Sequence, residues 1–184
     1  PGPKPGVPIG GMLMLNDKEI RRQIKEKGLI KDFIHLETQA TPNGFDLTVN
    51  KIFEFNGAGA LDFSNKEREI PVEKELIPKK KKPQDKFGWW NLKKGAYKIK
   101  TNECVSIPKD LVAVAFPRSS LLRMGAFTQT AVWDAGFRGI SEFILIVNNP
   151  KGIRVKQNAR IVQLVFLKIN EAAQGYQGIY QEKK

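Results

Sequence analysis

The sequence predicts a mainly β fold, a distorted jelly roll or β-barrel with a short N-terminal helix and a short helix later in the chain. Many short segments either alternate apolar and polar residues or form continuous apolar runs. These patterns are typical of strands that are buried on one face or on both. Polar turn signals separate the segments at fairly regular spacing, as in β-sandwiches and barrels.

The N-terminal helix is predicted over residues 16–28, which read NDKEIRRQIKEKG. Asn16 or Asp17 can cap its first turn, and Gly28 can end it in a left-handed conformation. Beyond this glycine the helical period of apolar residues disappears. The next elements are therefore predicted as strands, at 45–55, 96–107, 111–116, 143–147 and 160–169.

The length of 184 residues suits one domain with a substantial core. Residues 1–11 are rich in Pro and Gly, and we interpret them as a flexible arm or a cloning remnant. We expect residues 12–184 to form a single domain. Within it, 56–95 is an irregular excursion holding a strand or two, and 170–184 is a C-terminal tail.

Composition excludes several classes of protein. The chain has one cysteine, Cys104, and one histidine, His35. This pair can form neither a disulfide nor a Cys/His zinc site, and the motifs of a zinc-dependent nucleobase deaminase are missing. A lone cysteine fits a reducing compartment, so we expect a cytoplasmic protein. No stretch approaches 18 apolar residues, and no membrane association is expected.

The net charge of +12 and the pI near 9.8 indicate an anionic partner. One interpretation is a basic β-barrel that binds nucleic acid, because Lys79–Lys82 precede the pair Trp89-Trp90. A run of lysines is more often a solvated loop, however, and we do not expect nucleic acid to be the partner. A phosphorylated small molecule is the alternative.

A candidate phosphate site lies in PRSSLLRMG, residues 117–125. Two serines begin a short predicted helix that Gly125 ends, and the unpaired N–H groups of a first helical turn attract anions. Arg118 and Arg123 add positive charge, and a guanidinium can hold phosphate with two parallel hydrogen bonds. Taken alone, the segment is better explained as a serine-capped surface helix with two surface arginines.

Four segments together resemble the ordered motifs of the trimeric dUTPase and dCTP deaminase family. They are NGFDL (43–47), PRSSLLRMG (117–125), AVWDAGFRG (131–139) and ARIVQLVF (159–166). The first three are most similar to the branch that contains the dCTP deaminases, as are the N-terminal helix and the tail YQGIYQ (176–181). The resemblance implies the fold and a homotrimer whose active sites are shared between subunits.

The resemblance also implies the role of each site residue. Asp134 matches the catalytic aspartate that activates water for attack on the α-phosphorus, the work of a general base. Asp46 matches an aspartate that supports the site and contacts Mg²⁺ through water, with the triphosphate holding most of the ion. The other matched residues contact the substrate: Arg118, Ser119 and Ser120 around the phosphates, Arg123 of the same motif, Thr130, Ala131 and Val132 at the base, Phe137 under the sugar, Gln163 of the fourth motif, and Tyr176 and Gln181 of the tail.

Simpler interpretations remain for single residues. Asp134 also suits a hairpin turn, Gln163 the solvated face of a strand, and Phe137 the core. Only the ordered set of motifs favours the functional interpretation.

The departure that decides between the two activities of the family lies just beyond the third motif. Where a dCTP deaminase has its catalytic glutamate, ten residues after the aspartate, this chain has Ile144. Glu142 stands two residues earlier, on the same face of a regular strand. An isoleucine cannot pass protons to a pyrimidine. We therefore predict hydrolysis of dUTP to dUMP and pyrophosphate with Mg²⁺, which limits uracil in DNA and supplies dUMP. The alternative is a dCTP deaminase or a bifunctional enzyme, if a bulge moves Glu142.

Overall fold

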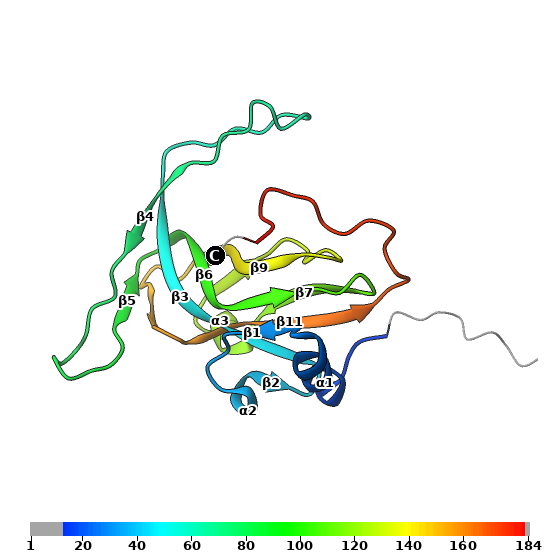
Figure 1. Cartoon of the computed structure of the whole chain (residues 1–184). Helices are drawn as coiled ribbons and strands as arrows, with labels where there is room; N and C mark the ends of the chain where they lie inside the picture. Colours follow the sequence, from blue (N-terminus) through cyan, green and yellow to red (C-terminus); the bar gives the residue numbers. More distant parts are fainter. Residues whose placement is uncertain (1–12, 183–184) are drawn as a thin grey trace, which may run out of the picture.

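The fold is mainly β, as predicted, and a computed structural model describes it for residues 13–182 (Figure 1). The arm predicted at 1–11 lies outside the described residues. Eleven strands and three short helices follow the chain over that range. None of these helices is long and apolar enough to cross a membrane.

The predicted N-terminal helix is α1, Asp17–Lys27. The side chain of Asn16 accepts a hydrogen bond from the backbone of Glu19, whose carboxylate accepts one from the Asn16 backbone in return. Gly28 ends the helix at φ 65°, the left-handed conformation that glycine adopts at little cost. Ile20 is fully buried and fixes the helix on the barrel.

Four of the predicted strands, at 45–55, 96–107, 111–116 and 160–169, are present with changes of one residue at their ends, whereas the strand predicted at 143–147 begins five residues earlier, at Arg138. The bounds are β1 Ile30–Lys31, β2 Ala40–Thr41, β3 Gly44–Asn56, β4 Val72–Leu76, β5 Trp89–Leu92, β6 Gly95–Ser106, β7 Leu111–Pro117, β8 Ala126–Gln129, β9 Arg138–Val147, β10 Ile153–Lys156 and β11 Arg160–Lys168. The remaining helices are α2, Leu36–Gln39, and α3, Ser119–Arg123. The sequence patterns did not predict α2, β1, β2, β8 or β10, which are all very short.

The main sheet runs in the order β7-β11-β3-β6-β9-β8, with antiparallel neighbours throughout. Its two outer strands, β7 and β8, contact each other, so the sheet forms a nearly closed barrel. Closure of this kind removes exposed strand edges. It also brings the loops that carry the second and third motifs to the rim of one barrel.

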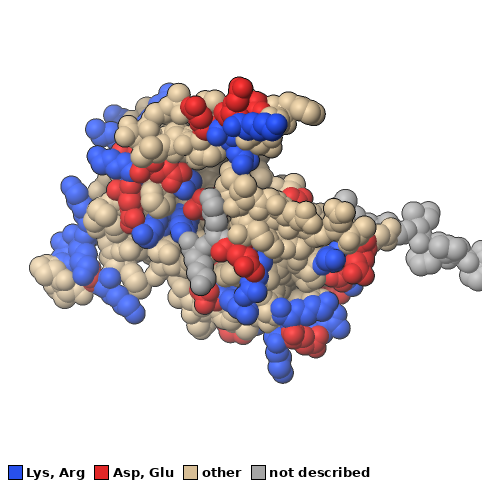
Figure 2. All heavy atoms as spheres, turned by 45° about the horizontal axis from the view of Figure 1, so that its top comes forward, with Lys and Arg blue, Asp and Glu red and all other residues tan. Residues whose placement is uncertain are grey.

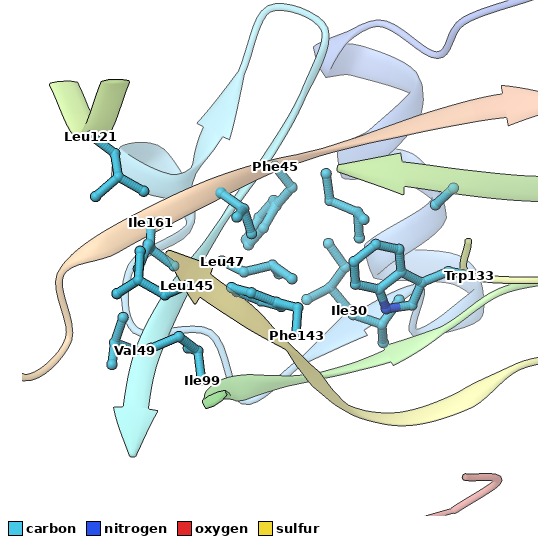
Figure 3. Close-up of a cluster of buried hydrophobic side chains, with 14 of the residues drawn as sticks. Ile30, Phe45, Leu47, Val49, Ile99, Leu121, Trp133, Phe143, Leu145 and Ile161 are labelled. Carbon is cyan, nitrogen blue, oxygen red and sulfur yellow. The ribbon is translucent and has the colours of Figure 1, made fainter. Parts of the chain in front are cut away.

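The barrel interior is apolar because alternate residues of each strand point inward. β9 alternates between buried and more exposed residues along most of its length, and β6 does the same. Phe45, Leu47, Ile99 and Leu145 are fully buried and pack together in the centre (Figure 3). Each such side chain contributes about 1.5–3 kcal/mol through burial of its apolar surface.

The excursion at 56–95 carries two strands: β4 pairs with the second half of β3, and β5 pairs with β10. Its outer part projects from the barrel between β3 and β4 (Figure 1). Lys and Arg gather on the side of the molecule with β4 and β5, interspersed with Asp and Glu (Figure 2). Trp90 is buried, and the ring of Trp89 is approached by Lys81, Arg154 and Lys156. The two indoles therefore do not form a stacking platform.

Candidate active site

The turn that carries Asp134 is fastened to the barrel on both sides. Trp133, just before it, pairs with Ala113 of β7, and the Trp133 Nε1–H donates to Ser141 Oγ over 2.9 Å. After it, the amide of Gly136 donates to the carbonyl of Ile107 over 2.9 Å. Gly136 has φ 84°, which a residue with a side chain rarely adopts. Asp134 itself stays exposed while its backbone is fixed.

Asp134 lines a cavity of about 900 Å³. Four other residues predicted to contact substrate line the same cavity: Ala131, Val132, Phe137 and Tyr176. The rings of Phe137 and Tyr176 meet edge to face, with their centroids 5.5 Å apart. The structure therefore brings together the residues predicted to contact uracil, to activate water and to support the sugar. It also places Tyr176 of the tail with them. Thr130, the first residue of the predicted hairpin, does not line the cavity.

A second group of predicted residues forms around Asp46 on the other side of the barrel rim. The Nε of Arg118 lies 3.0 Å from Asp46 Oδ2, and Arg160 Nη1 lies 3.2 Å from the same oxygen. Asp46 is 2% exposed, whereas the side chain of Arg118 is 31% exposed. Asp46 thus holds Arg118 in place from below and leaves part of its guanidinium open to a ligand.

Gln163 belongs to this second group. It pairs with Asp46 in the register of β11 and β3, and its Nε2 donates to Thr41 Oγ1 over 2.6 Å. Gly44 of the first motif is required here, because a Cβ at that position would lie 2.5 Å from the carbonyl oxygen of Leu164. The glycine of the first motif therefore allows the close approach that places Gln163 beside Asp46.

The serines of the second motif lie on α3, a single turn of five residues. Ser119, Ser120 and Arg123 are exposed on it, and Arg118 is its N-cap without a side-chain capping bond. A helix this short provides little macrodipole. The interpretation as a phosphate site therefore rests on the guanidinium and the hydroxyl groups.

Within one chain these two groups of residues are far apart. Trp133 lies opposite Ala113 of β7 in an antiparallel bridge. Asp134, the next residue, therefore lies on the side of Val112, whereas Arg118 lies five residues beyond Ala113 in the other direction. At about 3.3 Å per residue, Asp134 and Arg118 are roughly 20 Å apart along the strand direction. None of Arg118, Ser119, Ser120, Arg123 and Gln163 lines the Asp134 cavity. One chain does not bring the base and the phosphate contacts to a single phosphorus atom.

The described residues do not provide a protein cage for a metal ion. Residues 13–182 contain no group of three Asp, Glu, His or Cys side chains that would hold one. Burial raises the pKa of Asp46 although Arg118 and Arg160 oppose that rise. Its carboxylate is already ion-paired with two guanidinium groups, so Asp46 fits poorly as a direct metal ligand. Its predicted contact with Mg²⁺ through water stays a prediction.

The tail passes directly over the turn that carries Asp134. The amide of Tyr176 donates to the carbonyl of Ala135 over 2.8 Å. Gln181 Nε2 donates to the carbonyl of Gly136 over 3.0 Å, and Gln181 Oε1 accepts from the amide of Arg138 over 3.0 Å. Gln181 therefore fastens the tail to the third motif, and it lies outside the Asp134 cavity.

Glu142 and Ile144 both line the Asp134 cavity, on the same face of β9. The barrel has an irregularity near them, but it lies in β6 between Lys100 and Cys104. β9 itself stays regular in its pairing with β8, where Ile144 lies opposite Gln129. No bulge in β9 moves Glu142 to the position of residue 144.

Two charged residues of the cavity were missed from the sequence. Lys98 of β6 and Glu73 of β4 form an ion pair, and Lys98 Nζ also lies 3.2 Å from Glu142 Oε2. Alternation along β6 places Lys98 on the outer face of that strand. Glu73 could not be placed beside it, because the sequence did not indicate which strand β4 pairs with.

A model of the dCTP deaminase-like family matches residues 14–169. The chain belongs to this family. Curated relatives of the family extend over almost the whole chain. A probable deoxyuridine 5′-triphosphate nucleotidohydrolase of Archaeoglobus fulgidus is 44% identical over 92% of this chain and 96% of its own. A second protein of the same name, from Methanosarcina mazei, is 47% identical over 94% of this chain and 98% of its own length.

A solved structure supports the fold. The crystal structure of 2′-deoxycytidine 5′-triphosphate deaminase from Agrobacterium tumefaciens superposes with a TM-score of 0.62 at 22% identity. The match covers 85% of this chain and 48% of that one, so the chain spans about half the length of the deaminase. This member of the dCTP deaminase-like family thus has the barrel predicted from its motifs.

Proposed function

We propose that this chain is a dUTP nucleotidohydrolase, which converts dUTP to dUMP and pyrophosphate, the activity that the names of its curated relatives state. The observation that carries the proposal is the cavity shared by Asp134, Phe137 and the 131–132 hairpin, with Ile144 in place of an acid. Such a cavity holds a carboxylate for a water molecule but lacks a proton shuttle at the deaminase position.

In the proposed reaction a water molecule attacks the α-phosphorus, and the Asp134 carboxylate accepts its proton. The bond to the bridging oxygen of the β-phosphate breaks, and pyrophosphate leaves. Phosphoryl transfer depends mainly on positioning and charge stabilisation, which Arg118, Ser119 and Ser120 would supply. Gln163 and Arg123 would complete this contact with the phosphates.

The base and the sugar would bind in the 900 Å³ cavity. The backbone of Thr130, Ala131 and Val132 would contact uracil, and the Phe137 ring would lie under the deoxyribose. A ring face at this place leaves no room for a ribose 2′-hydroxyl. Tyr176, already against Phe137, would cover the nucleotide together with the tail.

Mg²⁺ is proposed as a companion of the triphosphate. The ion would neutralise phosphate charge and favour attack at the α-phosphorus. Because no protein cage is found at 13–182, the phosphate oxygens and water would supply most of its ligands.

We also propose a homotrimer with active sites between subunits. It is supported by the separation of roughly 20 Å between Asp134 and Arg118 within one chain, which a neighbouring copy would bridge. Complementation tests this directly. Asp134→Asn and Arg118→Ala variants should each be inactive, whereas chains unfolded and refolded together should regain activity at about a quarter of their sites. Persistent inactivity of the mixed, correctly assembled protein would refute shared sites.

The activity itself is tested by incubating pure protein with dUTP and, separately, with dCTP, each with Mg²⁺. We expect pyrophosphate from dUTP and no ammonia from dCTP. Ammonia from dCTP would make the chain a deaminase or a bifunctional enzyme. No turnover of either nucleotide, together with salt-sensitive retention of single-stranded DNA, would favour the nucleic-acid-binding interpretation.

A further inference from the structure

An ion-pair cluster of three side chains lies in the wall of the cavity that contains Asp134. Lys98 Nζ lies between the carboxylates of Glu73 and Glu142 and 4.9 Å from the centroid of the Phe53 ring. The side chains of Lys98 and Glu73 are only 17% and 20% exposed, and that of Glu142 is 31% exposed. All three charged side chains line the cavity, next to apolar residues such as Ile140 and Ile144.

Stability alone gives little reason for such a cluster at this place. Partly buried ion pairs lose much of their Coulombic attraction to the cost of removing charges from water. The cluster also has two carboxylates for one ammonium in the cavity where a nucleotide with four negative charges is proposed to bind. A role in recognition of an uncharged part of that nucleotide would explain its presence.

The hydrogen-bonding edges of the two pyrimidines differ in the groups that Lys98 and Glu142 can address. Uracil donates from N3–H and accepts at O4, whereas cytosine accepts at N3 and donates from its 4-amino group. Lysine is only a donor, and an ionised glutamate is only an acceptor. Side by side, the two groups complement uracil at both positions and oppose cytosine at both.

The geometry suits a single base edge. Lys98 pairs with Ile144 in the register of β6 and β9, and Glu142 lies two residues along β9 on the same face. The Nζ–Oε2 distance of 3.2 Å places a donor directly beside an acceptor, so that both can face neighbouring polar groups on one edge of a pyrimidine. The ammonium has three protons, so it can donate to a base while it contacts both carboxylates.

We propose that Lys98 and Glu142 select uracil over cytosine, with Lys98 Nζ donating to O4 and the Glu142 carboxylate accepting from N3–H. This inference rests on the proposed dUTP hydrolysis and adds side-chain selection to the backbone contacts of the 130–132 hairpin. Glu73 is a positioning residue in this arrangement, because it holds Lys98 from the side of β4. The excursion therefore contributes to substrate choice through Glu73.

The test compares kcat/KM for pyrophosphate release from dUTP and from dCTP in Glu142→Gln and Lys98→Met. We expect each variant to lower the dUTP/dCTP ratio by about 10-fold or more, mainly through KM for dUTP, because a lost polar contact leaves its partner unpaired. Lys98→Arg, which keeps a cationic donor, should retain more of the preference than Lys98→Met. The matched control is Lys51→Met. Lys51 forms an exposed ion pair with Glu75 over 2.9 Å between β3 and β4, outside the cavity, and its loss should leave the ratio unchanged.

A ratio that stays within twofold of the wild-type value in Glu142→Gln would overturn the proposal, as would equal losses on both nucleotides. Glu142→Gln keeps the shape of a partly exposed side chain, so it carries the test even if Lys98→Met fails to fold. Binding of dUTP and dCTP to Asp134→Asn, measured by calorimetry, separates this inference from the proposed function. A preference for dUTP that Glu142→Gln abolishes in that background would support base selection even in a protein without turnover.

Discussion

The Nε of Arg118 lies 3.0 Å from Oδ2 of Asp46, and this ion pair joins the first and second motifs at the end of strand β7. Asp46 is almost completely buried, and Arg160 contacts the same oxygen. Burial of the carboxylate below and partial exposure of the guanidinium above orient Arg118 toward the rim of the barrel. The two motifs therefore act as one unit.

Replacement of Asp46 by Asn should separate its role in orienting Arg118 from a role in metal binding. We expect kcat/KM for dUTP to fall by about 10- to 100-fold, because two guanidinium groups lose their shared acceptor. The Mg²⁺ concentration for half-maximal activity should change little if the carboxylate acts only through Arg118. A large rise in that concentration would instead support the predicted contact with Mg²⁺ through water.

Asp134→Asn should abolish most of the activity without weakening the fold. Removal of a general base typically costs about 10²–10⁴-fold in kcat. Because the side chain is exposed and its turn is held by backbone hydrogen bonds, the melting temperature should stay within about 2 °C of the wild-type value. Asp85→Asn, in the lysine-rich loop, is the control and should keep full turnover. Full turnover by Asp134→Asn would refute its assignment as the base.

Phe137→Ala should weaken the discrimination between dUTP and UTP. The ring is proposed to exclude the ribose hydroxyl, so its removal should admit UTP and lower the kcat/KM ratio by about 10-fold. Loss of the contact with Tyr176 should also raise KM for dUTP. Comparison of the two nucleotides under identical conditions measures both effects. An unchanged ratio would show that the residue serves packing alone.

Gly136→Ala should displace the C-terminal tail. A Cβ at Gly136 would lie 2.7 Å from Gly175 Cα, and the φ of 84° adds strain for any residue with a side chain. We expect faster proteolysis after residue 170 and a higher KM for dUTP. Gly57→Ala is the matched control, because Gly57 has φ 121° but a Cβ there would meet no atom within 4 Å. Equal rates of proteolysis in the two variants would show that the contact with Gly175 is unimportant.

Glu103→Gln should change how stability depends on pH. Glu103 is fully buried and accepts from Gln39 and from Thr48, and burial raises its pKa despite these hydrogen bonds. Between the ordinary glutamate pKa and the higher pKa of the folded state, the folded protein holds a proton that the unfolded chain has lost, so this residue makes the protein less stable as pH rises through that window. The glutamine variant lacks this decline. Its melting temperature relative to wild type, at fixed protein concentration, should therefore rise as the pH increases through that window, and Glu26→Gln, at an exposed position, is the control.

Local patterns in the sequence were sufficient for most of the fold. The capped helix at 17–27 and the long strands were predicted because capping, period-2 alternation and apolar runs involve residues close together in the chain. The short elements β1 and β2 have no such pattern, since each is defined only by its partner strand. The pairing of β4 with β3 likewise depends on residues far apart in sequence.

By itself, the sequence determined the barrel class, the order of the motifs and the missing acid at Ile144, because each depends on residue types at fixed spacing. Only the tertiary structure decided which of these residues meet. It places Asp134 with Phe137 and Tyr176, and Arg118 with Asp46 and Gln163, in two groups that one chain keeps apart. It also brings Lys98 between Glu73 and Glu142, because strand pairing and the closure of a barrel juxtapose side chains that no local pattern connects.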